Sequence, residues 1–208
     1  MHPTVVYQDM ASPTNPKKVL VFAGSNRSDS LNRKLAYSAA SALNKTGIET
    51  TVIDLREFAL PIYDGDLESE DGLPLNAKRL KAIAKSHDGF VLSSPEYNGS
   101  FPALLKNTLD WISRPEPGEG PLSVFRGKTA AILSASPGPG GGQRCLRQLK
   151  ELLEMMGMNV AAQASVPKAL SAFSPTGQVV RAETAQALET LAADFAQAIG
   201  VHPAPGIS

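Results

Sequence analysis

A short polar loop near the amino-terminal end contains the first residues that could do chemistry. It reads Gly24-Ser25-Asn26-Arg27-Ser28-Asp29-Ser30-Leu31-Asn32 and leads directly into a helical pattern. Its hydroxyl, amide and guanidinium groups, with the free N–H groups of a helix start, suit a phosphate monoester carrying about two negative charges. The loop matches neither G-x-x-x-x-G-K-S/T nor G-x-G-x-x-G, so the usual nucleoside triphosphate and dinucleotide sites are not favoured. An ordinary helix N-cap by Ser28 or Ser30 explains the loop about equally well.

A second polar loop, Ser93-Ser94-Pro95-Glu96-Tyr97-Asn98-Gly99-Ser100, follows an apolar run. Pro95 and Gly99 bracket a tight turn in which Asn98 or Gly99 can adopt positive φ, leaving backbone N–H groups free to face a ligand. A planar heteroaromatic ring with nitrogen and oxygen acceptors would satisfy those groups. A solvated turn in which Ser100 caps the next helix is the slightly favoured alternative when turn chemistry is considered alone.

A third loop, Ser134-Ala135-Ser136-Pro137-Gly138-Pro139-Gly140-Gly141-Gly142-Gln143, is rich in glycine. Glycines let the backbone approach a ligand closely, and the helix that follows favours negative charge near its start. A reduced flavin anion is one group that would benefit. A flexible connection explains the same residues, so this loop is weak support by itself.

Few other side chains could carry chemistry. The single cysteine, Cys145, cannot form an internal disulfide, and no Cys/His cluster could build a zinc site. The three histidines are His2, His87 and His202, so a catalytic triad could draw only on His87. We expect no metal site, an inert thiol at the start of a helix, and a loop histidine before a strand.

Composition excludes several classes of protein. The chain has 208 residues, with 20 Lys+Arg and 20 Asp+Glu, so it lacks the basic field on which non-specific nucleic-acid binding depends. Hydrophobic residues make up 42%, and no apolar run approaches the roughly 20 residues that span a bilayer. The first 17 residues lack the pattern of a secretory signal. We therefore expect a cytoplasmic protein with neither a nucleic-acid partner nor a membrane span.

Strand and helix patterns alternate along the chain and would position the three loops. Continuous apolar runs predict strands at 18–23, 48–55, 87–93, 128–134 and 159–166. Helical spacing predicts helices from 31 to about 47 and at 75–85, 100–112, 142–156 and 181–199, with Pro102 in the first turn of its helix. Residues 58–73 and 114–127 are expected to be long connections.

This alternation indicates an α/β fold, a three-layer sandwich with a five-stranded parallel sheet between helices. We expect a flexible arm over 1–17, a single domain over 18–200 and a flexible tail over 201–208. Ligands of such sheets bind at the carboxyl ends of the strands. The loops after the first, third and fourth strands meet at that edge, so they can share one ligand.

The first two loops, together with Leu105-Lys106-Asn107-Thr108-Leu109-Asp110-Trp111-Ile112-Ser113-Arg114-Pro115, resemble the NADPH-dependent FMN reductase family. The resemblance covers about residues 18–198. It implies a flavodoxin-like fold with strand order 2-1-3-4-5 and non-covalently bound FMN. It also implies transfer of reducing equivalents from NADPH or NADH to a flavin, a quinone, an azo dye or an oxyanion such as chromate.

The resemblance also implies a set of cofactor-binding residues. Those expected at the FMN phosphate are Ser25, Arg27, Ser30 and Asn32, with Leu31 in the same loop. Those expected to line the isoalloxazine ring are Pro95, Glu96, Tyr97, Asn98 and Gly99, and those expected on its other side are Ser134, Ser136 and Gly138. No protein acid or base is expected to be catalytic, because the chemistry belongs to N5 of the flavin.

Two places depart from the family pattern. The usual Pro-Gly after the second loop is Pro102-Ala103 here, and the run from Gly140 to Gly142 replaces a more varied loop. The family's helix after the second loop belongs to a subunit interface, so a homodimer or homotetramer is expected. For Lys106, Asn107, Asp110 and Trp111 we nevertheless favour a structural role.

Other interpretations stay open. A flavodoxin-type electron carrier would be expected to be strongly acidic, whereas this chain is neutral, so the enzyme is favoured. A flavin-free interaction module could use the same fold, because fold alone does not give function. The sequence does not choose between NADH and NADPH: Arg114, Arg126 and Arg144 are all candidates to bind a 2′-phosphate. It does not name the electron acceptor either.

Overall fold

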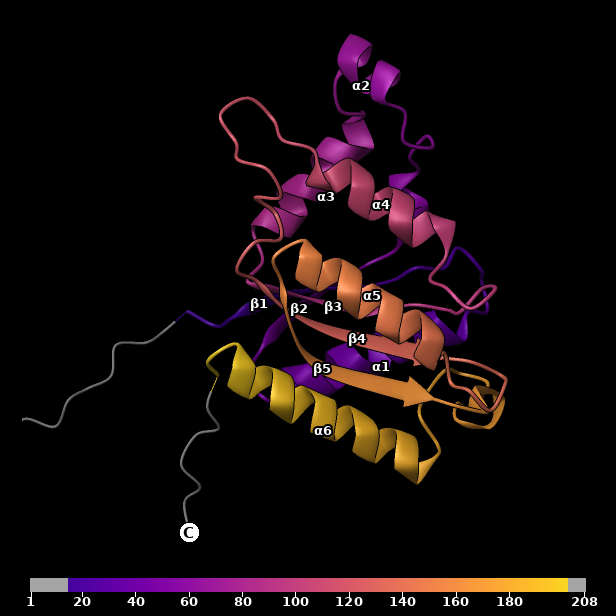
Figure 1. The fold of residues 1–208 in the computed structure, drawn as a ribbon. Coiled ribbons are helices and arrows are strands. Elements are labelled where there is room, and N and C mark those ends of the chain that lie inside the picture. Colours follow the sequence, from indigo (N-terminus) through magenta and orange to yellow (C-terminus); the bar gives the residue numbers. More distant parts are fainter. Residues whose placement is uncertain (1–14, 202–208) are drawn as a thin grey trace, which may run out of the picture.

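A computed structural model describes residues 15–201 of the chain (Figure 1). The predicted flexible arm and tail lie almost entirely outside these residues. The described part contains one five-stranded parallel sheet in the order β2-β1-β3-β4-β5, as predicted. Its strands are β1 Lys18–Ala23, β2 Glu49–Ile53, β3 Gly89–Ser93, β4 Thr129–Ala135 and β5 Asn159–Val166.

Helices cover both faces of the sheet (Figure 1). Helices α1 Leu31–Asn44 and α6 Ala182–Ala198 lie on one face; α3 Leu75–Lys85, α4 Ala103–Ser113 and α5 Gln143–Met155 lie on the other. Successive strand residues point to opposite faces. Val19 and Val21 therefore pack toward α1, while Leu20 and Phe22 pack toward α3 and α4. Both faces are buried, which explains the continuous apolar runs in the sequence.

One helix was not predicted. Helix α2, Gly65–Asp71, lies within the segment expected to be a connection and projects beyond α3 and α4 (Figure 1). None of its residues is buried, so it has no apolar stripe to reveal it in the sequence. It begins where the Asp64 side chain accepts a hydrogen bond from the backbone N–H of Asp66. Short 3₁₀ turns also occur at Leu55–Phe58 and Ala169–Ser171.

The start of α4 differs from its prediction. Pro102 is the N-cap residue, with ψ of 153°, rather than a member of the first helical turn. Ser100 belongs instead to a hydrogen-bonded turn with Tyr97. The interpretation of Ser100 as a helix cap is therefore wrong.

Within residues 15–201, no helix is both long enough and apolar enough to cross a membrane. Within the same range, no group of three or more His, Cys, Asp or Glu side chains is arranged to hold a metal ion.

Candidate functional site

The loops after β1, β3 and β4 line one cavity at the carboxyl edge of the sheet, with a volume of about 160 Å³. The parallel register brings these strand ends together, because Ala23 is aligned with Ser93 and Ser93 with Leu133. The predicted residues that line the cavity are Ser25, Arg27, Ser30, Leu31, Asn32, Pro95, Glu96, Tyr97 and Ser136. The predicted residues that lie outside its lining are Asn98, Gly99, Ser134 and Gly138.

The first loop presents buried hydroxyl groups beside an exposed guanidinium. The Ser30 oxygen accepts a hydrogen bond from the backbone N–H of Arg33 at 3.3 Å, which confirms the N-cap interpretation at this residue. The Ser25 oxygen accepts from the N–H of Arg27 at 3.4 Å. Both hydroxyl hydrogens are left to donate to an anion. The N-cap and the anion-binding interpretations are therefore compatible.

Two basic residues of α1 form ion pairs that stabilise this loop. Arg33 bonds to Asp54 at 2.7 Å and reaches the backbone oxygens of the loop. Asp29 also lines the cavity and was not among the predicted site residues; it pairs with Lys34 at 2.5 Å. The hydrogen bond and charge of Lys34 lower the pKa of Asp29. The Lys34 charge balances this carboxylate, so a nearby phosphate would not face an unpaired negative charge.

Asn32 has a structural role that was not predicted from the sequence. Its side-chain Nδ2 donates to the Ala135 oxygen at 2.9 Å. Its Oδ1 accepts from the Ala135 N–H at 2.9 Å and from the Ser93 hydroxyl at 3.0 Å. The buried carboxamide therefore joins α1 to β3 and β4. Asn32 thus helps to position the three loops, and because it also lines the cavity its contact with a phosphate stays a prediction.

The turn of the second loop has the expected conformation. Asn98 and Gly99 both adopt positive φ, 51° and 80°. The N–H groups of Tyr97 and Ser100 each donate to the other residue's backbone oxygen, so they are not free to face a ligand. Asn98 is exposed outside the cavity, whereas Tyr97 lines it. Tyr97 is therefore the residue of this turn that lines the cavity.

Helix α5 holds the second loop through Glu96. The Glu96 carboxylate accepts from the backbone N–H groups of Arg144 and Cys145, each at 3.1 Å. The N-cap residue of α5 is Gly142, which has no side chain to cap the helix, so Glu96 does so from the neighbouring loop. The helix start is thus already balanced by a carboxylate. The expectation that it stabilises a reduced flavin anion is not supported.

A second side chain of α5, Gln148, completes this attachment and was missed in the sequence. Its Nε2 donates to the Gly99 oxygen at 2.9 Å, and its Oε1 accepts from the Ser100 hydroxyl at 2.7 Å. These bonds fix the carboxyl-terminal end of the turn that follows Tyr97. Gln148 resembles any polar residue on a helix surface, and only the folded structure shows what it contacts.

The glycine-rich loop packs closely over the end of β4. Gly141 and Gly142 both adopt positive φ, and a Cβ on Gly142 would stand 1.8 Å from the Ser134 oxygen. Ser134 is fully buried, and its hydroxyl has no hydrogen-bond partner among residues 15–201. Ser134 therefore lies beneath the glycines rather than in the cavity. Ser136 does line the cavity, and its hydroxyl accepts from the N–H of Gly138 at 3.2 Å.

Cys145 and His87, which the sequence offered as possible reactive side chains, are both buried and hydrogen-bonded. Burial raises the pKa of Cys145 to about 11, and its thiol donates to the Ser94 hydroxyl at 3.1 Å. It is protonated at neutral pH, in agreement with the inert interpretation. The buried His87 ring contacts the Ile83 oxygen at 2.6 Å and the Thr51 hydroxyl at 2.8 Å, just before β3 begins. It lies at the opposite edge of the sheet from the cavity.

Helix α4 anchors the segment that carries α2, as the structural interpretation of its side chains predicts. The Asn107 carboxamide accepts from the Tyr63 N–H at 2.7 Å and donates to the Pro61 oxygen at 2.8 Å. The indole N–H of Trp111 donates to the same Pro61 oxygen at 2.8 Å. Lys106 and Asp110 form an ion pair with each other on the same helix.

Arg114 belongs to this anchored segment as well. Its Nε donates to both carboxylate oxygens of Glu68 at 2.9 Å, and its guanidinium lies 5.5 Å from the centre of the Tyr63 ring. Burial acts to raise the pKa of Glu68, but the hydrogen bonds from Arg114 and Tyr63 hold it below its usual value. This arginine is therefore already paired.

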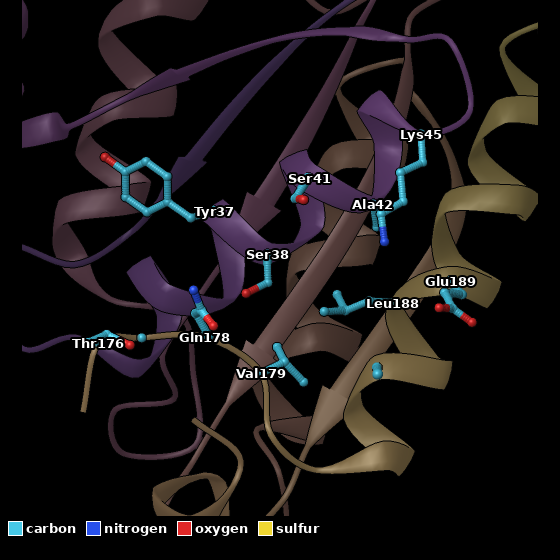
Figure 2. Close-up of a pocket in the computed structure, with 12 residues that line it drawn as sticks. Tyr37, Ser38, Ser41, Ala42, Lys45, Thr176, Gln178, Val179, Leu188 and Glu189 are labelled. Atoms are coloured by element: carbon cyan, nitrogen blue, oxygen red, sulfur yellow. The ribbon is translucent and has the colours of Figure 1, made fainter. Parts of the chain in front are cut away.

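A second cavity, of about 520 Å³, lies between α1, the 176–179 segment and α6 (Figure 2). Tyr37 lies at one end, and Lys45 and Glu189 lie toward the other. None of the predicted cofactor-binding residues lines it. Its charged groups are one cation and one carboxylate, which do not form a set for binding a dianionic phosphate. We therefore place the candidate site at the carboxyl edge of the sheet.

Comparisons with known proteins agree with this architecture. The 2-hydroxy-1,4-benzoquinone reductase of a Burkholderia species is 34% identical over 182 residues, covering 86% of this chain and 94% of that protein. The quinone reductase of Escherichia coli K12 is 35% identical, covering 68% of this chain and 73% of its own length. The solved structure of FerB, a flavoenzyme NAD(P)H:(acceptor) oxidoreductase from Paracoccus denitrificans, shares 31% identity and a TM-score of 0.72, covering 89% of this chain and 98% of FerB.

The family itself is given by the sequence model of the NADPH-dependent FMN reductases, which matches residues 17–170. That range includes β1, β3 and β4 and the three loops that line the cavity. An archaeal flavodoxin, at 12% identity and a TM-score of 0.55, shares the fold alone. The chain belongs to the NADPH-dependent FMN reductase family.

Proposed function

We propose that the cavity at the carboxyl edge binds FMN and that the protein uses it to reduce a quinone with NADPH or NADH. Family membership makes the chain an FMN-dependent oxidoreductase rather than a simple electron carrier. The choice of a quinone is supported by the names of the relatives, several of which are quinone reductases. The observation that carries the site assignment is the single cavity lined by three loops that are far apart in the sequence.

The donors in the cavity fit the phosphate of FMN. The Ser25 and Ser30 hydroxyls and the Arg27 guanidinium supply hydrogen bonds and one positive charge next to the start of α1. They would hold the phosphate, and Pro95, Glu96 and Tyr97 would contact the ring. When bound there, FMN would supply the redox chemistry between the nicotinamide and the acceptor. The protein orients the two reactants, and we assign no catalytic acid or base.

The cavity is small and open for such a ligand. Its volume of about 160 Å³ lies below the roughly 300–1,000 Å³ of typical ligand pockets. The side chains of Tyr97 and Leu170 line it but are 47% and 72% exposed. We propose that the protein is a cytoplasmic homodimer or homotetramer in which a neighbouring subunit covers this open rim and the flavin ring.

An absorption spectrum followed after anaerobic mixing tests the proposed function. Protein with added FMN is expected to retain the flavin through gel filtration and to lose the oxidised-flavin band on mixing with NADPH or NADH. Adding a benzoquinone is expected to restore the band. Bound flavin that neither nicotinamide reduces would support a carrier, and protein that retains no FMN would overturn the site assignment.

The Arg27→Ala variant tests the phosphate contact. We expect its dissociation constant for FMN to rise about 10- to 100-fold, because a charge-assisted hydrogen bond is worth about 1.5–3 kcal/mol. Flavin fluorescence quenching on titration measures this constant. In the loaded variant, flavin reduction is expected to slow less than binding weakens. Arg126→Ala removes the same charge near the opposite edge of the sheet and serves as the control; equal FMN affinity in wild type and Arg27→Ala would refute the assignment.

A further inference from the structure

Choosing NADPH over NADH requires a group that recognises one additional phosphate, on the 2′-oxygen of the adenosine ribose. An arginine that has no internal partner and lies beside the flavin site is the side chain best suited to this, because its planar donors match phosphate oxygens. Several cations lie on elements at the carboxyl edge, so their contacts decide which of them is available.

Most of these cations are already engaged. Arg33 pairs with Asp54 and Lys34 with Asp29. Arg181 donates to the Thr184 hydroxyl and to two backbone oxygens of the loop after β5. We have assigned Arg27, which lines the cavity, to the phosphate of FMN.

Two of the three arginines considered in the sequence are also unsuitable. Arg114 is paired with Glu68 in the segment anchored to α4. Arg126 lies shortly before β4 begins, where its side chain packs against Gly157 at the amino edge of the sheet. Neither is positioned to reach a molecule stacked at the opposite edge.

Arg144 is exposed and lies at the candidate site. It stands in the first turn of α5, and a Cβ on Gly99 would be 3.8 Å from its Cδ, so its aliphatic stem lies beside the turn that follows Tyr97. Its backbone N–H bonds to Glu96, which lines the cavity. Within residues 15–201 its guanidinium makes no ion pair or hydrogen bond, whereas those of Arg33, Arg114 and Arg181 do.

We propose that the Arg144 side chain binds the 2′-phosphate of NADPH and makes the enzyme prefer NADPH over NADH. The inference rests on the proposed function, since it requires a nicotinamide to reach the flavin from the side of the second loop. The attachment of that loop to α5 through Glu96 and Gln148 fixes the backbone of Arg144 relative to the turn that follows Tyr97.

The test compares reduction of FMN-loaded wild type and Arg144→Ala by each nicotinamide under anaerobic stopped-flow conditions. NADH, which lacks the 2′-phosphate, is the internal reference. We expect wild type to require less NADPH than NADH for half-maximal reduction. In Arg144→Ala, the NADPH requirement divided by the NADH requirement is expected to rise about tenfold or more, the size expected when a charge-assisted hydrogen bond is lost.

Binding without turnover gives a second readout. Calorimetric titration with adenosine 2′,5′-bisphosphate is expected to show a similar loss of affinity in Arg144→Ala, while adenosine 5′-monophosphate shows none of that size. Lys150→Ala removes one positive charge from the same helix, where Lys150 pairs with Glu154, and controls for the general field. Arg147→Ala tests the next arginine along α5.

The outcomes separate this inference from the proposed function. An equal loss with both nicotinamides, an unchanged ratio, or the same shift in Lys150→Ala or Arg147→Ala would overturn the role of Arg144. If both nicotinamides bleach the flavin equally well in wild type, the reductase stands and the inference fails. If neither bleaches it, the proposed function fails and the inference fails with it.

Discussion

Replacing Trp111 with alanine is expected to lower the free energy of unfolding by about 3–5 kcal/mol, the usual cost of removing a large buried aromatic side chain. Trp111 is fully buried in a small cluster with Leu73 and Ala77, separate from the two main cores. Its ring meets Tyr63 edge to face at 5.0 Å between centroids. Urea denaturation followed by circular dichroism measures the loss; the method must not rely on tryptophan fluorescence, because the chain contains one Trp.

The same substitution is expected to release the segment from 59 to 74. The indole is one of the groups that hold this segment, through the hydrogen bond to Pro61 and the contact with Tyr63, and none of the residues of α2 is buried. Limited proteolysis should therefore cut within the segment faster in Trp111→Ala than in wild type. Trp111→Phe keeps an aromatic ring and removes the hydrogen bond, so it is expected to cost only about 1 kcal/mol. Unchanged cleavage in a destabilised Trp111→Ala would show that the segment is held by other contacts.

The sheet could be predicted because its strands are buried on both faces. The predicted bounds of β1 and β5 match the structure, and the other strands differ by two residues or fewer at either end. Covered faces leave continuous apolar runs such as Val19 to Phe22, which sequence periodicity detects. Helix α2 was not predicted, because a helix without a buried face has no periodic pattern of apolar residues.

The loops of the candidate site could be identified, but not the contacts that hold them together. Polar residues that follow a buried strand indicate a site at the sheet edge. Asn32 bonds to a residue 103 positions away, and Glu96 bonds to residues 48 and 49 positions away. Such partners depend on the strand order and on the register of the sheet. The family resemblance implies a phosphate contact for Asn32, and only the structure shows that its carboxamide also bonds to β3 and β4.

Gly142→Ala is the second substitution with a large expected effect. The residue adopts φ of 80°, a conformation that costs a residue with a Cβ about 1–2 kcal/mol. The new Cβ would also stand 1.8 Å from the Ser134 oxygen and 2.6 Å from its Cβ, and relieving such overlap in a packed interior costs about 1–3 kcal/mol. We expect the free energy of unfolding, measured in urea, to fall by about 2–5 kcal/mol. FMN affinity should fall as well, because Gly142 begins the helix that Glu96 caps.

Gly140→Ala is the matched control, since a Cβ there meets open space in the same loop and is expected to be nearly neutral. Substitutions of Ser134 then separate the two causes of the lower free energy of unfolding, the positive φ and the overlap with Ser134. Ser134→Gly removes both overlapping atoms, so the double variant Ser134→Gly/Gly142→Ala should be less destabilised than the sum of the single variants. Ser134→Ala keeps the Cβ that would lie 2.6 Å away and should give less relief. If the losses from Gly142→Ala and Ser134→Gly simply add, the overlap does not contribute; if Gly140→Ala is equally damaging, the loop rather than this close approach limits stability.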